Sequence, residues 1–254
     1  MVFVALLIAP LAMAAAALTE RRLGPSAAGW VAALPVSFAV AIVAVTLDAG
    51  EDAASAMALS AATHVAAQVV FAVIFAAVLT RHGLLFGGAA GTLAYGACSV
   101  GLWHVPDVLP ILAAVPLLGV APRLINSSRP NIGSPRRWPT TTMTCVAAAI
   151  VVGAAVLTTR LAGPVAAGAV AAFPTISTTL AVTIVMRDGS LAGAHVLGGL
   201  IRSLPCYLTF CLVVALTAPS VGLPAVALAL LGCVAAGRVA WRAVPRAPRV
   251  AAAQ

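Results

Sequence analysis

Ionisable side chains occur inside otherwise apolar stretches of this 254-residue chain. Arg202 lies in the middle of one apolar run, where a buried cation costs roughly 3 kcal/mol or more in a bilayer. His195 precedes Arg202 by seven residues, which puts both side chains on one face of a helix. An arginine facing a cavity would suit an anionic substrate. The structural alternative is an Arg202 side chain that reaches carbonyl groups or the membrane interface.

Other polar groups lie at comparable depth in predicted membrane spans. His64 and Gln68 are one helical turn apart near the middle of one such span. Hydroxyl side chains follow Pro35 and Pro174 in two others, namely Ser37, Thr175, Ser177 and Thr178. A histidine in a span can relay protons near neutral pH, whereas histidine and hydroxyl groups also serve as ordinary helix–helix hydrogen-bond partners. Substrate binding is the functional hypothesis for these residues, and helix packing is the alternative.

Motifs of enzymes and metal sites are missing from the sequence. It contains no HExxH, GxSxG, P-loop or nucleotide-binding fingerprint, and no pair of carboxylates within an apolar segment. The five cysteines all fall in apolar segments without a CxxC spacing, as expected for small buried hydrophobic residues. We therefore expect a protein that is not an enzyme and that needs neither a metal nor another cofactor.

Composition predicts an all-α polytopic membrane protein. Hydrophobic residues make up 63% of the chain and charged residues only 8%, with a mean hydropathy of +1.12. A soluble domain has about 25% charged residues, so this chain lacks the polar surface to face water. The net charge of +8 comes from arginines at the ends of apolar segments. This placement favours contact with the lipid bilayer over nucleic-acid binding.

Nine membrane spans are predicted from the apolar runs, each near the ~20 residues that cross a bilayer. Arginines concentrate in alternate loops, which predicts an inner-membrane protein with its N-terminus outside and its C-terminus in the cytoplasm. The fifth run is short and contains three prolines, so a re-entrant segment is its alternative. The predicted spans are 1–19, 26–47, 54–80, 83–103, 106–121, 140–159, 165–186, 190–217 and 221–241.

An internal repeat is the strongest signal in the sequence. Residues 24–35 (GPSAAGWVAALP) and 163–174 (GPVAAGAVAAFP) are identical at nine of twelve positions. The repeat predicts a four-span unit at 1–104, a linker span and loop at 105–139, and a second four-span unit with a basic tail at 140–254. A single span between the units turns the second upside down relative to the first. This 4+1+4 inverted arrangement recurs in secondary transporters.

Prolines at matching places mark the spans that would line a transport site. Pro35 and Pro174 fall within predicted spans, where proline removes a backbone hydrogen bond and kinks the helix. Paired interruptions in two halves point to a binding site at the bilayer midplane. Plain packing of small residues around tolerated kinks is the alternative.

The stretch AGAVAAFPT at 167–175 resembles a motif of the GlpM-like family of small bacterial inner-membrane proteins. Each such protein is one four-span unit, so the chain is similar to two of these units fused through a linker span. The proline–aromatic stretch LPCY at 204–207 adds to this resemblance. The resemblance implies the fold and the location, and it carries no chemistry to individual residues.

A secondary transporter or permease for a small solute, anions included, is the leading functional hypothesis. The rival is a membrane scaffold or assembly component that transports nothing, for example in the export of an envelope polymer. Beyond the lipid bilayer and the solute, the sequence is compatible with a homodimer or a partner membrane protein. A cavity at the midplane favours the transporter, and a dry interface between the halves favours the scaffold.

Overall fold

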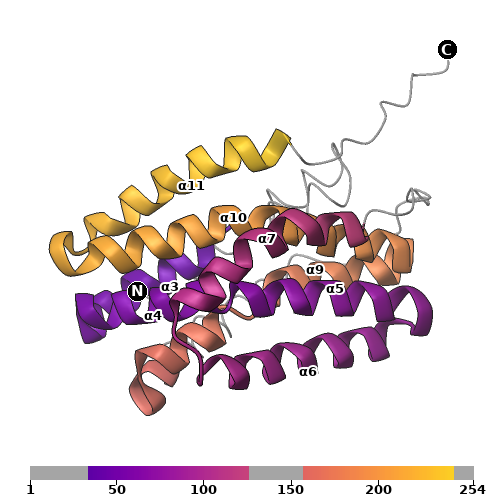
Figure 1. The fold of residues 1–254 in the computed structure, drawn as a ribbon, viewed down its shortest axis with the longest axis horizontal. Helices are drawn as coiled ribbons and strands as arrows, with labels where there is room; N and C mark the ends of the chain where they lie inside the picture. The colour runs from indigo at the N-terminus through magenta and orange to yellow at the C-terminus, as the bar shows by residue number, and fades with distance from the viewer. Residues whose placement is uncertain (1–33, 126–156, 243–254) are drawn as a thin grey trace.

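The computed structural model describes residues 34–125 and 157–242, and all the regular structure in these ranges is helical. The helices run roughly along one direction, the long axis of Figure 1. In the first range they are α3 (Val36–Ala49), α4 (Glu51–Thr63), α5 (Val65–His82), α6 (Leu84–Leu102) and α7 (Val108–Ile125). The second range holds a helix at Leu157–Ala171, followed by α9 (Thr175–Asp188), α10 (Ser190–Val221) and α11 (Pro224–Arg242).

Several of these helices are long and apolar enough to cross a membrane. Among the described residues four qualify, and a fifth is added if the bent pair Leu157–Ala171 and α9 forms one span. The four are Glu51–His82, Leu84–Leu102, Val108–Ile125 and Ser190–Val221. The chain is therefore a helical, multi-pass membrane protein. The fifth predicted span, 106–121, corresponds to one of the four. It is α7, a helix that continues through Pro116 and Pro122.

Some predicted spans fall partly or wholly outside the described residues. The first span (1–19) lies outside them, as do most of the sixth (140–159) and the beginning of the second (26–47). One boundary differs from the expectation. Glu51 was expected in a loop, but it begins α4, where a carboxylate is favourable next to the positive end of the helix dipole.

Helices of the first described range recur in the second described range at one constant spacing along the chain. We call this the repeat spacing, and it is the sequence separation that relates Pro35 to Pro174. α3 and α9 have 14 residues each, and their first residues correspond at the repeat spacing. The stretch formed by α4 and α5 has 32 residues, as does α10, and the bounds of the two also correspond. The main difference is a break at His64, where the first stretch divides into two helices.

Glycines connect these helices through equivalent backbone conformations. Gly50 joins α3 to α4 with φ 89° and ψ 174°, and Gly189 joins α9 to α10 with φ 87° and ψ 175°. Positive φ strains any residue with a Cβ atom. The matched glycines therefore explain why both chain reversals need only one residue.

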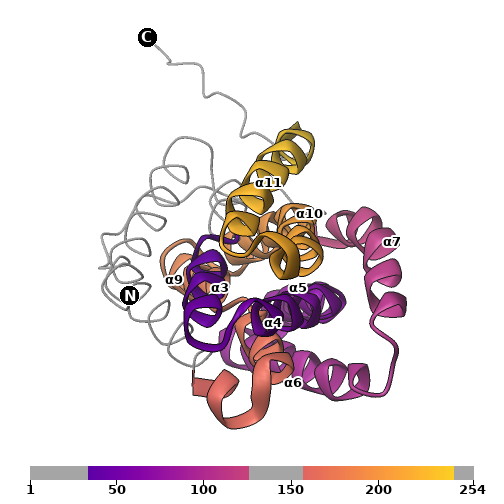
Figure 2. The same ribbon diagram turned by 90° about the vertical axis from the view of Figure 1, so that its left-hand side faces the viewer.

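Matching helices pack side by side in opposite directions. α4 and α5 both pack against α10, and the Ser55 hydroxyl near the start of α4 donates to the Ala215 carbonyl near the end of α10 at 2.7 Å. At the other end of α5, Leu79 lies next to Gly193 near the start of α10. Figure 2, which views the bundle end-on, shows α5 beside α10, with α6 and α7 further out.

Close contacts attach the helix at 157–171 to α3 and α4. The Ser60 hydroxyl donates to the Val165 carbonyl at 2.7 Å, and a methyl group at Gly168 would overlap the Met57 carbonyl. Arg160 forms a two-pronged ion pair with Asp48 at the end of α3, with Nε–Oδ2 and Nη2–Oδ1 distances of 2.9 and 2.5 Å. These contacts hold the helix across α4.

Candidate functional site

One of the two predicted proline kinks is a break between two described helices. Pro174 separates the helix ending at Ala171 from α9, and the two segments are bent by 41°. Pro35 stands at the equivalent position directly before α3, and the residues that precede Leu34 lie outside the described ranges. Proline lacks an N–H group and cannot continue a helical ladder from the preceding residues, so α3 and α9 each begin directly after a proline.

Both helices begin with backbone donors that lack acceptors among the described residues. The first helical hydrogen bonds are donated by Ala39 to Pro35 and by Thr178 to Pro174. Within the described residues, no acceptor is bonded to the N–H groups at four intervening positions, and neither helix has a side-chain cap. The four positions are Ser37, Phe38, Ile176 and Ser177. Such free N–H groups normally seek side chains, water or ligands.

The start of α3 and the break at Pro174 meet at one cavity of about 60 Å³. A buried water needs roughly 10–15 Å³ of such volume, so the cavity has room for about five water molecules. Residues 34, 35, 37, 38 and 41 contribute to the lining from the α3 segment, and residues 171–177 contribute from the break before α9. Gln68, Leu200 and Tyr207 complete the wall from α5 and α10.

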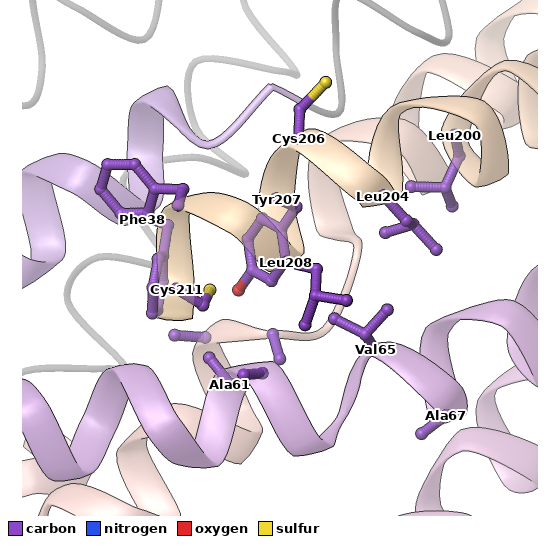
Figure 3. Close-up of a cluster of buried hydrophobic side chains, with 14 of the residues drawn as sticks. Phe38, Ala61, Val65, Ala67, Leu200, Leu204, Cys206, Tyr207, Leu208 and Cys211 are labelled. Carbon is purple, nitrogen blue, oxygen red and sulfur yellow. The ribbon is translucent and has the colours of Figure 1, made fainter. Parts of the chain in front are cut away.

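Two polar side chains of the wall have unsatisfied ends. Gln68 is only 3% exposed and its amide nitrogen has no hydrogen-bond partner among the described residues. Tyr207 is 6% exposed, and its hydroxyl has only the weakly accepting Cys211 sulfur beside it (Figure 3). Because an unpaired buried polar group costs about 1–3 kcal/mol, these groups are suited to a polar ligand or ordered water.

The predicted hydroxyl residues divide between the cavity and the helix backbone. Ser37, Thr175 and Ser177 line the cavity, and the buried Ser37 hydroxyl has no partner in the described part of the chain. Thr178 lies outside the lining, and its hydroxyl donates to the Pro174 carbonyl at 2.8 Å. The cavity therefore contains three of the four predicted hydroxyls, both prolines and Gln68.

His64 occupies the break between α4 and α5 and does not line the cavity. Its Nδ1 lies 2.7 Å from the Ser60 carbonyl, so this nitrogen carries the proton and donates. Its Nε2 is buried without a partner among the described residues. The 6.3 Å separation between the His64 and Tyr95 rings indicates aromatic packing. His64 therefore supports a helix break next to the site.

Arg202 is 6% exposed and lies outside the cavity lining. Leu200, which does line it, is two residues away, and this spacing turns the two side chains to opposite faces of α10. The Arg202 Nη1 atom is beside Gly198 and near Ile125 at the end of α7, with no hydrogen-bond partner in the described ranges. His195 is half-buried on the Arg202 face and is also absent from the lining. The predicted anchor and the cavity are thus separate.

Aromatic residues of the site were not predicted from the sequence. Tyr207 of α10 and Phe38 of α3 pack together with ring centroids 5.3 Å apart, and both are labelled in Figure 3. Phe173 packs against Tyr95 of α6 at 5.2 Å, and the Tyr95 hydroxyl donates to the Ala169 carbonyl at 2.6 Å. One signal was available, because Tyr207 follows Gln68 at the repeat spacing.

The lining offers hydrogen bonds without charged side chains. The lining combines backbone N–H, hydroxyl and amide groups with apolar side chains, and none of the described lining residues is ionised at neutral pH. No group of three histidine, cysteine or carboxylate side chains that could hold a metal ion occurs in residues 34–125 and 157–242. The described part of the wall therefore offers uncharged hydrogen-bonding groups.

Comparison with known proteins adds no assignment: no family model, curated protein or solved structure matches the chain. The resemblance to GlpM-like proteins consequently stays a prediction from the motif at 167–175.

Proposed function

We propose that the protein is a secondary transporter that moves a small solute across the inner membrane by alternating access. The observation that carries the proposal is the meeting, at one cavity, of two helix starts that each follow a proline, one of them at a helix break, and that are related by the repeat spacing. Broken helices that surround a site between two repeats are the usual binding architecture of such transporters.

The position of the cavity supports this function. Gln68 and Tyr207 are each the eighteenth residue of a 32-residue helical stretch. At 1.5 Å per residue, both lie near the middle of a stretch about 48 Å long. A site at this depth lies about equally far from the two ends of the stretch, which suits a site that opens to each face in turn.

An inverted repeat supplies a mechanism for the movement. We infer nine spans in a 4+1+4 arrangement, with the N-terminus outside and the C-terminus in the cytoplasm. The antiparallel contact of Ser55 with Ala215 and the matched helix bounds support this arrangement. If each half adopts the conformation of the other, a site open to one face becomes open to the opposite face.

Counterflow in proteoliposomes tests the proposal. Vesicles preloaded with an unlabelled solute should accumulate the labelled solute only if a carrier exchanges the two. The panel contains formate, nitrate, acetate, glycine, glycerol and methylammonium. Pro174→Ala should lower the exchange rate by roughly tenfold or more, because it alters a hinge. Pro116→Ala removes an exposed proline within α7 and is the matched control.

The scaffold hypothesis predicts a different outcome. A cysteine introduced by Ser177→Cys, in a variant without the five native cysteines, should react with membrane-impermeant thiol reagents from each side of a transporter. In a scaffold with a dry interface it would react from neither side. Absence of both counterflow and labelling would overturn the transport proposal.

A further inference from the structure

The free donors at the cavity belong to two helix N-termini that converge. Ser37 and Phe38 are in the first turn of α3, and Ile176 and Ser177 are in the first turn of α9. Their N–H groups lack acceptors in the described part of the chain. We infer that the cavity binds a small anion between these helix starts, a conclusion that rests on the proposed function and specifies its substrate class.

Helix dipoles favour negative charge at this location. The N-terminus of a helix carries the equivalent of about +0.5 elementary charge, and α3 and α9 each contribute one such end. Together they supply the equivalent of about one positive charge in a low-dielectric setting, where electrostatic attraction is strong. Anions bind readily at helix N-termini for these reasons.

Side chains of the lining supply an independent indication. Gln68 and Tyr207 both line the cavity and are more than nine-tenths buried. The Gln68 amide nitrogen has no partner among the described residues, and the Tyr207 hydroxyl has only the Cys211 sulfur beside it. An amide N–H and a phenol O–H can both donate to an anion. None of the described lining residues is acidic, so none of them would repel an anion.

The size of the cavity limits the ligand. A volume of about 60 Å³ holds a group of about five non-hydrogen atoms, judged by the space that water requires. Formate, nitrate and halides match this size.

Arg202 is not a contact of this ligand, since it lies outside the lining. The inference therefore depends on α3, α9 and the two polar side chains. It differs from the sequence-based hypothesis, in which Arg202 binds the anion directly.

Isothermal titration of the purified full-length protein with formate and nitrate tests the inference, with glycerol and methylammonium as neutral and cationic probes. Ser177→Asp puts a carboxylate in the first turn of α9, beside N–H groups that lack acceptors among the described residues, where its charge repels an anion. We expect anion affinity to fall by about 100-fold or more, because like charges in contact cost several kcal/mol. Ser177→Asn should weaken binding by less than about tenfold, since an amide adds no charge.

Leu85→Asp is the matched control, because it adds the same charge to the first turn of another helix, α6, at a residue that is 85% exposed. It should leave anion affinity unchanged. Gln68→Glu offers a second variant with nearly the native shape, and it should also abolish anion binding. Both Ser177→Asp and Gln68→Glu change charge more than volume, so melting temperatures close to the native value would exclude misfolding.

The outcomes separate this inference from the proposed function. Counterflow of glycerol, glycine or methylammonium that is insensitive to Ser177→Asp would overturn the anion inference and leave transport intact. Equal anion affinity in Ser177→Asp and Leu85→Asp would also overturn it. Absence of both binding and counterflow would overturn the inference and the proposed function together.

Discussion

Gln68 and Tyr207 occupy equivalent positions of two helical stretches that run in opposite directions, and both line the same cavity. The spacing that separates them also relates Pro35 to Pro174 before α3 and α9. Two segments of the chain therefore contribute equivalent positions to one site, although the residues at these positions differ. An amide on one side and a phenol on the other make the site chemically asymmetric. A bound anion would therefore have different hydrogen-bond donors on its two sides.

Cross-linking will test the antiparallel packing of α4 against α10. In a variant without native cysteines, Ser55→Cys combined with Ala215→Cys should form a disulfide on mild oxidation. The Ser55 hydroxyl donates to the Ala215 carbonyl at 2.7 Å, so the two residues lie on directly contacting turns, and a disulfide requires such close approach. Gel mobility after proteolysis between the two sites reports the link.

Ser55→Cys with Ala194→Cys is the control pair. Ala194 follows Ser55 at the repeat spacing and would be its neighbour if matching helices packed in the same direction. It belongs to the end of α10 that contacts Leu79, so no cross-link is expected. A link to Ala194 would contradict the inverted arrangement and with it the mechanism of alternating access.

Gly168 should be essential for the crossing of the 157–171 helix over α4. A Cβ atom at this position would overlap the Met57 carbonyl and lie 2.7 Å from the Ser60 Cβ. The Met57 carbonyl belongs to the backbone of α4, which cannot move aside cheaply. Gly168→Ala is expected to destabilise the protein by about 1–3 kcal/mol, as overpacking does. Gly96→Ala, which meets open space on α6, should instead be neutral or gain up to about 1 kcal/mol from helix propensity. Unfolding in SDS followed by circular dichroism measures both.

Sequence reasoning predicted the parts of the fold that depend on local chemistry. Runs of apolar residues indicated the membrane helices, and the proline at position 174 indicated the 41° bend, because a missing N–H group has the same effect in any context. The repeat motif drew attention to both helix starts that line the cavity. Such features follow from the residue and its neighbours in the chain.

Features that depend on helix rotation were not predictable in the same way. Arg202 was assigned to the site because it is buried and charged, but only the packing of α10 decides which face meets the cavity. Tyr207 was passed over, since an aromatic residue in a membrane helix is ordinary. The break at His64 was missed as well, because no proline or glycine marks it.

The Asp48–Arg160 ion pair should be sensitive to pH and salt. Arg160 donates two hydrogen bonds to Asp48 and lowers the pKa of its carboxyl below the usual 3.8. The stabilisation is therefore present above the unfolded-state pKa and is lost as the pH falls through the lower pKa of the folded state. In a double-mutant cycle with Asp48→Asn and Arg160→Gln, melting temperatures should show coupling at pH 7 that disappears near pH 2 and in 1 M salt. Coupling that persists under both conditions would contradict an electrostatic origin.

Replacing Arg202 tests whether its buried guanidinium stabilises or destabilises the folded protein. Its Nη1 atom has no hydrogen-bond partner in the described ranges and lies against Gly198 and Ile125. A charge that has no ionic partner at such depth opposes folding by roughly 3 kcal/mol. If Arg202 has none beyond the described residues either, Arg202→Met, which keeps most of the volume, should raise the melting temperature in detergent. Arg123→Met, at a residue near the end of α7, is the control and should change it little. A lower melting temperature for Arg202→Met alone would mean that the guanidinium has an anionic partner in the folded protein, and lipid extraction would then identify whether that partner is a headgroup.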